Sequence, residues 1–457
     1  MSSQVSYPAR CGLALVSGAV YSLAYPPVSG GGWLVIPGIA GLLLALQGQE
    51  GTRARTIGFI HGMVAYGLSL SWLFQIFGWI AVILWCVLAA FTALFVEMQS
   101  RASRRGLVGW KFGVFTALNW CGWEFIRAEL FPLKFPWMTV GLAIGPNGFL
   151  PWIGVYGVSL LVLLAVGFLL ARSWAALFIP FAIFFGRMDY PLPGAWPDSG
   201  DPLAVKVGGL QMEGESLTEF LKGTKQLPPD VQHVVWPEYA VPYDLRASKR
   251  DWKLVQDLCV QKKITLTLGT QSRPGGGDAW RNIALTLDAG GARGEHTKVH
   301  TVHMFDDGIA GTTALPIETD HGKVGTPICF DCDYEGIVRQ MTVAGAELFV
   351  VPMMDVEKWT ARQHEQHAAL FRIRACENAR WMFVCGTSGV SQIIDSCGSV
   401  QTRLDPLTRD VITGTMRRET ILTFYSRIGW LTPWFVLGMA FIGWLILSLP
   451  VKKTEAG

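Results

Sequence analysis

The sequence is poor in charge: only 16% of its 457 residues are Asp, Glu, Lys or Arg, and the net charge is +3. So small a positive balance gives no case for nucleic-acid binding. The nine cysteines show no spacing typical of a disulfide framework, and the one CxxC pair, Cys329 and Cys332, has no second CxxC partner. The sequence also lacks the HExxH motif of zinc metalloproteases. What is abundant is apolar: hydrophobic residues make up 51% of the chain.

Eight apolar stretches are candidates for helices that cross a membrane, which takes about 20 apolar residues each. Lys and Arg follow the second, fourth, sixth and last stretch. These basic residues all lie on the cytoplasmic side of the membrane if the N-terminus is cytoplasmic and every stretch crosses the membrane. The first stretch lacks a clear small-residue cleavage site, so we interpret it as a retained span. The stretches lie near 10–28, 31–48, 56–77, 78–98, 108–128, 150–171, 173–187 and 427–449.

The pattern changes after a Pro/Gly-rich joint at 191–202, where short β-branched runs alternate with helix-like segments. Such alternation favours an α/β domain. We therefore expect an N-terminal membrane domain of about seven spans at 1–187, an extracytoplasmic α/β domain at 188–426, and a C-terminal transmembrane helix with a short cytoplasmic tail at 427–457. The expected strands are 204–211, 233–238, 264–270, 282–288, 323–330, 347–353 and 382–388, and the expected helices are 246–262, 334–345 and 362–380.

Three polar residues of the central domain form a candidate catalytic set. Cys329 ends an apolar run, and a thiolate there would attack an acyl carbonyl to form a thioester. Glu238 follows Trp236 and Pro237 and is the candidate base, because an aromatic neighbour helps to raise a carboxylate pKa. Lys298 would stabilise the tetrahedral oxyanion together with the backbone N–H after Cys329. All three fall at or just beyond expected strand ends, where open α/β sheets place their sites.

Each of these residues alone has a commoner structural interpretation, so only their combination carries the hypothesis. A zinc site is the main rival, because several histidines have helix-compatible spacing and a CxxC lies in the same domain. We expect no metal and no organic cofactor, since neither HExH nor a lone CxxC is a zinc signature. A non-catalytic membrane scaffold is a second rival. The histidines concerned are His296, His300, His303, His364 and His367.

A glutamate, a lysine and a cysteine in this order resemble the nitrilase, or carbon–nitrogen hydrolase, superfamily, whose members carry a Glu-Lys-Cys triad on an α-β-β-α sandwich. The membrane part resembles the apolipoprotein N-acyltransferase family within it. The resemblance covers nearly the whole chain. Its motifs are LAYPP (23–27), SWLF (71–74), WEFIRAELF with Glu124 and Arg127, FPW (135–137), GVYGVSLL (154–161), VVWPEYAVP, TKVH, ICFD, Gln366-His367 and RACENAR (374–380).

This resemblance implies a multi-pass protein of the bacterial inner membrane, with about eight helices and a nitrilase-like domain on the periplasmic side. Family members move an acyl chain from a phospholipid onto the cysteine, and then onto the α-amine of the diacylglyceryl-cysteine of a lipoprotein. The matching residues are Glu238 as base, Lys298 as oxyanion partner and Cys329 as nucleophile. The supporting positions are Asp331, which matches a family glutamate, Phe330 beside the nucleophile, and Trp236, which would line the approach to the base.

The chain departs from the family between Lys298 and Cys329, where it is shorter. The family reads HLVPFGEY-P after its lysine, with a second supporting glutamate, and Asp306 is the nearest carboxylate in register here. We assign that supporting role to Asp306. The departure leaves two alternatives open: a membrane-anchored amidase that uses water, and an acyltransferase with a different amine acceptor.

Overall fold

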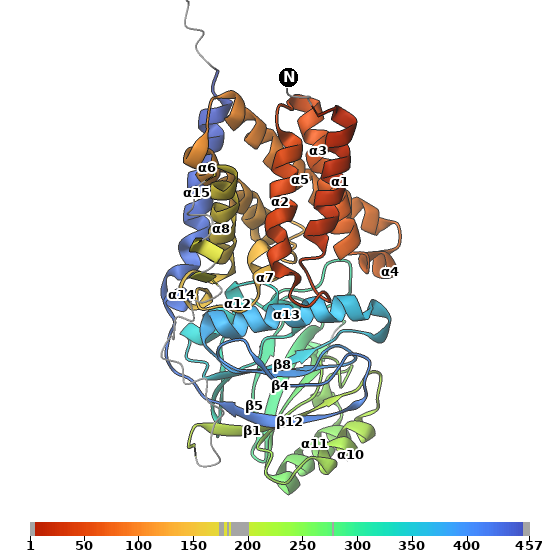
Figure 1. The fold of residues 1–457 in the computed structure, drawn as a ribbon. Helices are drawn as coiled ribbons and strands as arrows, with labels where there is room; N and C mark the ends of the chain where they lie inside the picture. The colour runs from red at the N-terminus through yellow and green to blue at the C-terminus, as the bar shows by residue number, and fades with distance from the viewer. Residues whose placement is uncertain (1–4, 173–177, 181, 184–200, 277, 451–457) are drawn as a thin grey trace, which may run out of the picture. The chain divides into compact units, whose positions relative to one another are not determined.

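The computed structural model describes residues 5–172, 178–180, 182–183, 201–276 and 278–450 (Figure 1). The chain divides into two compact units. The first contains Met1–Ile144, Ile153–Arg187 and Trp430–Gly457, and the second contains Gly145–Trp152 and Met188–Gly429.

The first unit is a bundle of apolar helices. In it α1 packs on α2 and α3, α3 packs on α5, and α6 packs on both α5 and α15. The contact between α3 and α5 is close because Gly62 has no side chain: a Cβ there would lie 2.7 Å from the Cα of Ala89. The helices are α1 (Tyr7–Ser22), α2 (Val35–Leu46), α3 (Gly51–Ser69), α4 (Leu73–Phe77), α5 (Ile80–Arg104), α6 (Gly109–Phe125), α7 (Val140–Ile144), α8 (Leu150–Leu170) and α15 (Thr432–Ser448).

Among the residues that the structure describes, three helical segments are long and apolar enough to cross a membrane: Ile80–Arg104, Leu150–Leu170 and Gly429–Ser448. Gly31–Leu46 is apolar but shorter, and α1 and α6 have only 16 and 17 residues. The expected span at 173–187 lies largely outside the described residues. The predicted count of about eight crossings is therefore not confirmed.

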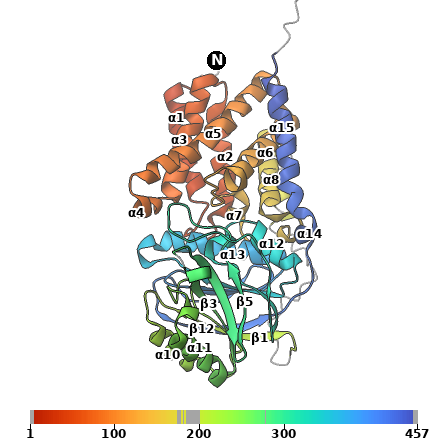
Figure 2. The ribbon, with the colours of Figure 1, turned by 180° about the vertical axis from the view of Figure 1, so that it is seen from behind.

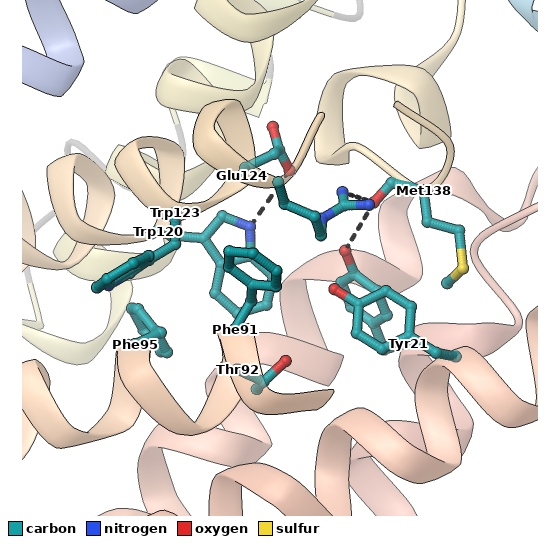
Figure 3. A pocket seen from close by; sticks show the side chains of 10 residues that line it. Tyr21, Phe91, Thr92, Phe95, Trp120, Trp123, Glu124 and Met138 are labelled. Carbon is teal, nitrogen blue, oxygen red and sulfur yellow. Dashed lines mark hydrogen bonds between the residues drawn. The ribbon is translucent and has the colours of Figure 1, made fainter. Parts of the chain in front are cut away.

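Buried polar side chains in this unit centre on Glu124 and Arg127, two of the residues that carry the family resemblance. The indole N–H of Trp120 donates to Oε2 of Glu124 at 3.3 Å (Figure 3). The backbone N–H of Val140 donates to the same oxygen at 2.9 Å. The guanidinium of Arg127 donates to the carbonyl of Phe135 at 2.7 Å. These bonds hold the irregular chain between α6 and α7, whose backbone groups would otherwise be buried without partners.

The second unit has two six-stranded sheets packed face to face between two helical layers. The strand orders are β12-β1-β2-β3-β4-β5 and β11-β10-β9-β8-β7-β6. Helices α10 and α11 pack on the first sheet, and α12 and α13 pack on the second (Figures 1 and 2). The helices are α10 (Leu217–Gln226), α11 (Lys249–Lys262), α12 (Gly336–Val343), α13 (Ala361–Asn378) and α14 (Phe424–Arg427).

The alternation of side chains along the strands builds three apolar layers. Val205 and Val207 of β1 pack between the sheets with Val350 and Phe383, whereas Leu210 faces α10. The strands are β1 (Ala204–Gln211), β2 (His233–Val235), β3 (Thr265–Ser272), β4 (Arg281–Asp288), β5 (Gly291–Thr297), β6 (Ile317–Thr319), β7 (Gly322–Gly325), β8 (Leu348–Met353), β9 (Met382–Gly386), β10 (Gln392–Ile394), β11 (Val400–Arg403) and β12 (Asp410–Arg417). This layering confirms the nitrilase-like sandwich predicted from the sequence.

All seven expected strands are present, as β1, β2, β3, β4, β7, β8 and β9, and the expected helices are α11, α12 and α13. Strands β2, β7 and β9 end earlier than expected. Strand β2 ends before Glu238 and β7 ends before Cys329, so both candidate residues lie on the turns that follow the strands.

Candidate active site

Lys298 is the first residue after β5, and its side chain is buried between two carboxylates. The Nζ atom lies 2.8 Å from Oε1 of Glu238 and 2.8 Å from Oδ2 of Asp307. The backbone N–H of Lys298 donates to the carbonyl of Asn282 on β4 at 2.9 Å. This bond continues the pairing of β4 with β5 past the end of the strand, and so fixes where the lysine side chain starts.

Asn282 and Tyr239 complete this buried cluster. The side-chain N–H₂ of Asn282 lies 2.6 Å from Oε1 of Glu238 and 2.8 Å from Oδ1 of Asp307. The hydroxyl of Tyr239 donates to the same Oδ1 at 2.6 Å. Sequence reasoning missed both residues. The available signals were that Tyr239 adjoins Glu238, and that Asn282 is a polar residue at the start of an otherwise apolar strand.

Cys329 opens a tight turn, Cys329–Cys332, after β7. Its φ of 45° lies in the left-handed region that residues other than glycine rarely adopt. Such a backbone costs roughly 1–3 kcal/mol and is concentrated at functional sites. The side chain is 5% exposed, and Sγ lies 3.7 Å from the carbonyl oxygen of Met354, just after β8.

Asp331 joins the turn of Cys329 to the chain that follows Lys298. Its Oδ1 accepts hydrogen bonds from the backbone N–H groups of Val299 and His300 at 3.0 and 2.8 Å. Its Oδ2 accepts one from the N–H of Ile328 at 3.1 Å. Burial opposes ionisation of this carboxyl, but hydrogen bonds from the side chains of His296 and His300 lower its pKa. A permanently charged acceptor therefore links the turns after β5 and β7.

The charges of the cluster suit proton transfer. Burial raises the pKa of Glu238, while the ammonium of Lys298 opposes that rise. Burial also works against the charge on Lys298, but the carboxylate of Glu238 raises its pKa, so the lysine stays protonated. Burial, and then the charge of Glu238, raise the pKa of the Cys329 thiol. Burial thus keeps the Cys329 thiol protonated, and the carboxyl of Glu238, whose charge acts on that thiol, is the candidate proton acceptor.

Two of the expected supporting residues lie elsewhere. Asp306 is exposed, and the buried carboxylate beside Lys298 belongs to its neighbour Asp307. Trp236 does not line the approach to Glu238. It is fully buried in the core under α10, where its indole N–H donates to Thr224 and its ring lies 5.2 Å from that of Phe220.

Phe330 lies beside the nucleophile, as expected from its position in the sequence. It is half-buried, and its ring meets that of Tyr334 edge to face at 5.2 Å.

A buried histidine of α13 connects the segments around Cys329. The ring of His367 lies 2.9 Å from Oδ1 of Asp355 and 3.1 Å from Oδ1 of Asp333. Asp355 follows Met354, the residue that accepts the bond from Cys329. Burial works against a charged ring, but the carboxylates of Asp355 and Asp333 raise the pKa of His367 to about 10.

We expect this histidine to make stability fall at alkaline pH. Its pKa in the folded protein is about 10, above the unfolded value of about 6.5. The stability that the charged ring of His367 contributes is therefore fully present below the pKa of the unfolded state. It is lost as pH rises through the pKa of the folded state. Thermal unfolding from pH 6 to 10.5 should show a loss of stability that is absent in His367→Gln. His364→Gln, one turn earlier on α13, should keep the wild-type decline; equal curves for wild type and His367→Gln would contradict the charged ring.

Three of the five histidines that suggested a zinc site have other partners. His296 Nε2 lies 3.0 Å from Asp331, His367 lies between two aspartates, and His364 Nε2 lies 3.1 Å from the carbonyl of Val356. Within the described part of the chain, no group of three or more His, Cys, Asp or Glu side chains is arranged to hold a metal ion.

Comparison with known families first defines the class. The carbon–nitrogen hydrolase family matches residues 215–424, the segment that contains Glu238, Lys298 and Cys329. The second unit is therefore a carbon–nitrogen hydrolase domain of the nitrilase superfamily. A solved structure of a nitrilase-superfamily protein from Saccharomyces cerevisiae is 20% identical, with a TM-score of 0.42, over 47% of this chain and 90% of that one.

The N-terminal half specifies the family. The apolipoprotein N-acyltransferase N-terminal domain matches residues 17–169. Proteins named apolipoprotein N-acyltransferase are similar over nearly the full length. The protein from Nitrosomonas europaea is 26% identical over 96% of this chain and 95% of its own length. The one from Geobacter metallireducens is 25% identical over 92% of each. The chain belongs to the apolipoprotein N-acyltransferase family.

Proposed function

We propose that this protein transfers a fatty acyl chain from a phospholipid to the N-terminal amine of a diacylglyceryl-cysteine lipoprotein, through a thioester on Cys329. The observation that carries the proposal is the buried Glu238–Lys298 pair, whose charges both act on the Cys329 thiol, in a chain that matches both domains of the family. The acyltransferase activity and the lipoprotein acceptor follow the name of the relatives.

In the first half-reaction Glu238 takes the thiol proton and the sulfur attacks the ester carbonyl of the phospholipid. An ammonium has three N–H donors, and two of those on Lys298 face Glu238 and Asp307. The third would stabilise the oxyanion, together with the backbone N–H of Phe330. The C–O bond then breaks, and Glu238 returns the proton to the departing lysophospholipid alcohol.

In the second half-reaction the lipoprotein amine attacks the thioester carbonyl. Glu238 takes a proton from the amine, the C–S bond breaks, and the proton returns to the sulfur of Cys329. An amide forms, and the enzyme is restored without metal or organic cofactor. Water in place of the amine would give hydrolysis, which is the alternative activity for the same residues.

Intact-protein mass spectrometry tests the proposal. The purified full-length protein is incubated with a phospholipid, and then with either a diacylated lipopeptide or buffer. We expect one acyl mass on the protein after the first step, and its transfer to the lipopeptide amine in the second. Loss of the adduct at the same rate in buffer would favour the hydrolase. No adduct with any phospholipid would overturn the acyl-enzyme.

We further propose eight membrane crossings, with a membrane domain at 1–187, an extracytoplasmic domain at 188–426 and a last helix at 427–457, in the bacterial inner membrane. The basic residues that follow alternate apolar stretches support this arrangement. Cys397 is exposed in the second unit. It should react with a membrane-impermeant maleimide in intact spheroplasts. Labelling only after lysis would place this domain in the cytoplasm and contradict the topology.

Asp307 and Asp306 provide a matched pair of variants. We expect Asp307→Asn to slow acyl-enzyme formation by about one to two powers of ten, because a charge-assisted hydrogen bond to Lys298 is lost. Asp306→Asn removes the same charge one residue away, from an exposed position. This variant should form the acyl-enzyme at the wild-type rate. Equal effects of the two would show that only the net charge of this loop matters. The measurement is the rate at which the acyl mass appears.

A further inference from the structure

A cavity lies in the helical unit, at the end where α2, α5 and α8 finish and α6 begins. Its volume is about 500 Å³, within the range of ligand-binding pockets. It is enclosed entirely by residues of the first unit, and none of them belongs to the candidate active site.

Two arginines stand on the rim of this cavity. Arg104 lies in the last turn of α5 and Arg172 lies just after α8, and both are exposed. A guanidinium nitrogen of Arg104 lies 3.6 Å from a carboxylate oxygen of Glu50, and these side chains are 46% and 57% exposed. An exposed ion pair of this kind contributes little to stability, so an anion that binds Arg104 more strongly can replace the carboxylate of Glu50.

Polar groups of short side chains also line the rim, whereas the walls are apolar. Ser103 and Gln47 are exposed at the rim. The walls come from the last turns of α2 and α8 and the first turns around α6. They are formed by Leu43, Leu46, Leu107, Phe112, Leu169 and Leu170. A charged rim above an apolar interior matches an amphiphile better than a water-soluble anion.

Two helices begin at this cavity without a side-chain cap. The N-cap residues of α3 and α6 are Glu50 and Val108, and neither side chain accepts a hydrogen bond from its helix. The first turns of both helices also lack acidic residues. Free N–H groups at helix starts favour an anion. They add to the positive charge that the two arginines place at the rim.

We propose that this cavity binds one anionic phospholipid of the surrounding bilayer, with the phosphate between Arg104 and Arg172 and the start of one acyl chain against the apolar walls. Basic pockets between membrane helices bind the head groups of anionic lipids in this way. The site is distinct from any donor site at Cys329, so the inference does not depend on the proposed acyl transfer.

Helix capping accounts for part of the arrangement but not for all of it. A cation in the last turn of α5 complements the carbonyl end of that helix, and this alone would explain Arg104. It does not explain the space that the described residues leave between the arginines and the leucines, since helix bundles otherwise pack densely. An occupant taken from the membrane accounts for both the charge and the space.

Native mass spectrometry of the full-length protein tests the site. The detergent-purified protein is titrated with dioleoylphosphatidylglycerol or with dioleoylphosphatidylcholine. We expect one tight adduct with the anionic lipid, and affinity about fivefold lower in either Arg104→Gln or Arg172→Gln and about 25-fold lower in the double variant. Ser103→Trp, which fills the cavity without changing charge, should also remove the adduct.

Lys111→Gln is the matched control, because Lys111 is a cation of the same region that does not line the cavity. Affinity reduced equally in this control would show general surface attraction and overturn the proposal. So would equal affinity for the two lipids, unchanged binding in Ser103→Trp, or displacement of the lipid by glycerol 3-phosphate. Circular dichroism of each variant checks folding. If the double arginine variant fails to fold, Ser103→Trp and the two lipids decide the question.

Discussion

Replacing Cys329 by alanine should abolish the acyl adduct on the intact protein and leave the fold unchanged. Sγ is the only atom that the change removes, and its contact is a long one of 3.7 Å to the carbonyl of Met354. We expect a stability change of less than about 2 kcal/mol, as for most single substitutions without a charge or cavity effect. The adduct and thermal unfolding are measured on the same preparation.

Cys332 supplies the control for this experiment. It lies in the same turn, is fully buried and is also a cysteine. Burial raises the pKa of its thiol, and the charge of Asp331 adds to that rise. We therefore expect Cys332→Ala to keep the adduct. An adduct that persists in Cys329→Ala but disappears in Cys332→Ala would show that Cys332, and not Cys329, is the nucleophile.

Replacing Glu238 by glutamine should slow both half-reactions by about 10²- to 10⁴-fold, the usual contribution of a general base. Glutamine keeps the shape of the side chain and an oxygen for the hydrogen bond from Asn282, while Lys298 keeps Asp307 as its partner. The loss would therefore report the missing base and not a rearranged site. Pre-steady-state appearance of the acyl mass, and its transfer to lipopeptide, measure the two steps separately.

The pH profile sharpens the same test. A general base must be deprotonated, so kcat/KM of the wild type should fall as pH falls through the pKa of Glu238, which burial raises. This acid limb should be absent in Glu238→Gln. If only one half-reaction slows, or if the limb persists, the proton acceptor is another group.

Glu238 and Cys329 of the candidate catalytic set could be placed from the sequence because each follows a strand that has a clear pattern, whereas Lys298 follows β5, which has none. The β-branched runs before Glu238 and Cys329 identify β2 and β7, and both residues occupy the turns that follow. The strands that were not predicted from the sequence lack such a pattern, and no pattern indicates how they pair. Strand β5 reads GARGEHT, and only its pairing with β4 makes it a strand.

Two supporting residues were predicted incorrectly, one because it lies in an irregular loop and the other because it lies in the core. Asp306 and Asp307 are neighbours, and no periodicity in an irregular segment tells which side chain points inward. The deciding contacts of Asp307 are to Lys298 and Tyr239, which are distant in sequence. Trp236 was expected near Glu238, two residues away, but its large ring and single N–H are satisfied by Phe220 and Thr224 in the core.

The hydrogen bonds of Asp331 have a consequence for an enzyme that must accept two unlike substrates in turn. They connect the segment after Lys298 to the turn of Cys329, and so oppose movement of one segment relative to the other. Whatever opens to admit a phospholipid, and later a lipopeptide, has to be chain outside this connection, such as the exposed residues 303–306. The proposed ping-pong cycle would then exchange its substrates around two turns that Asp331 ties together.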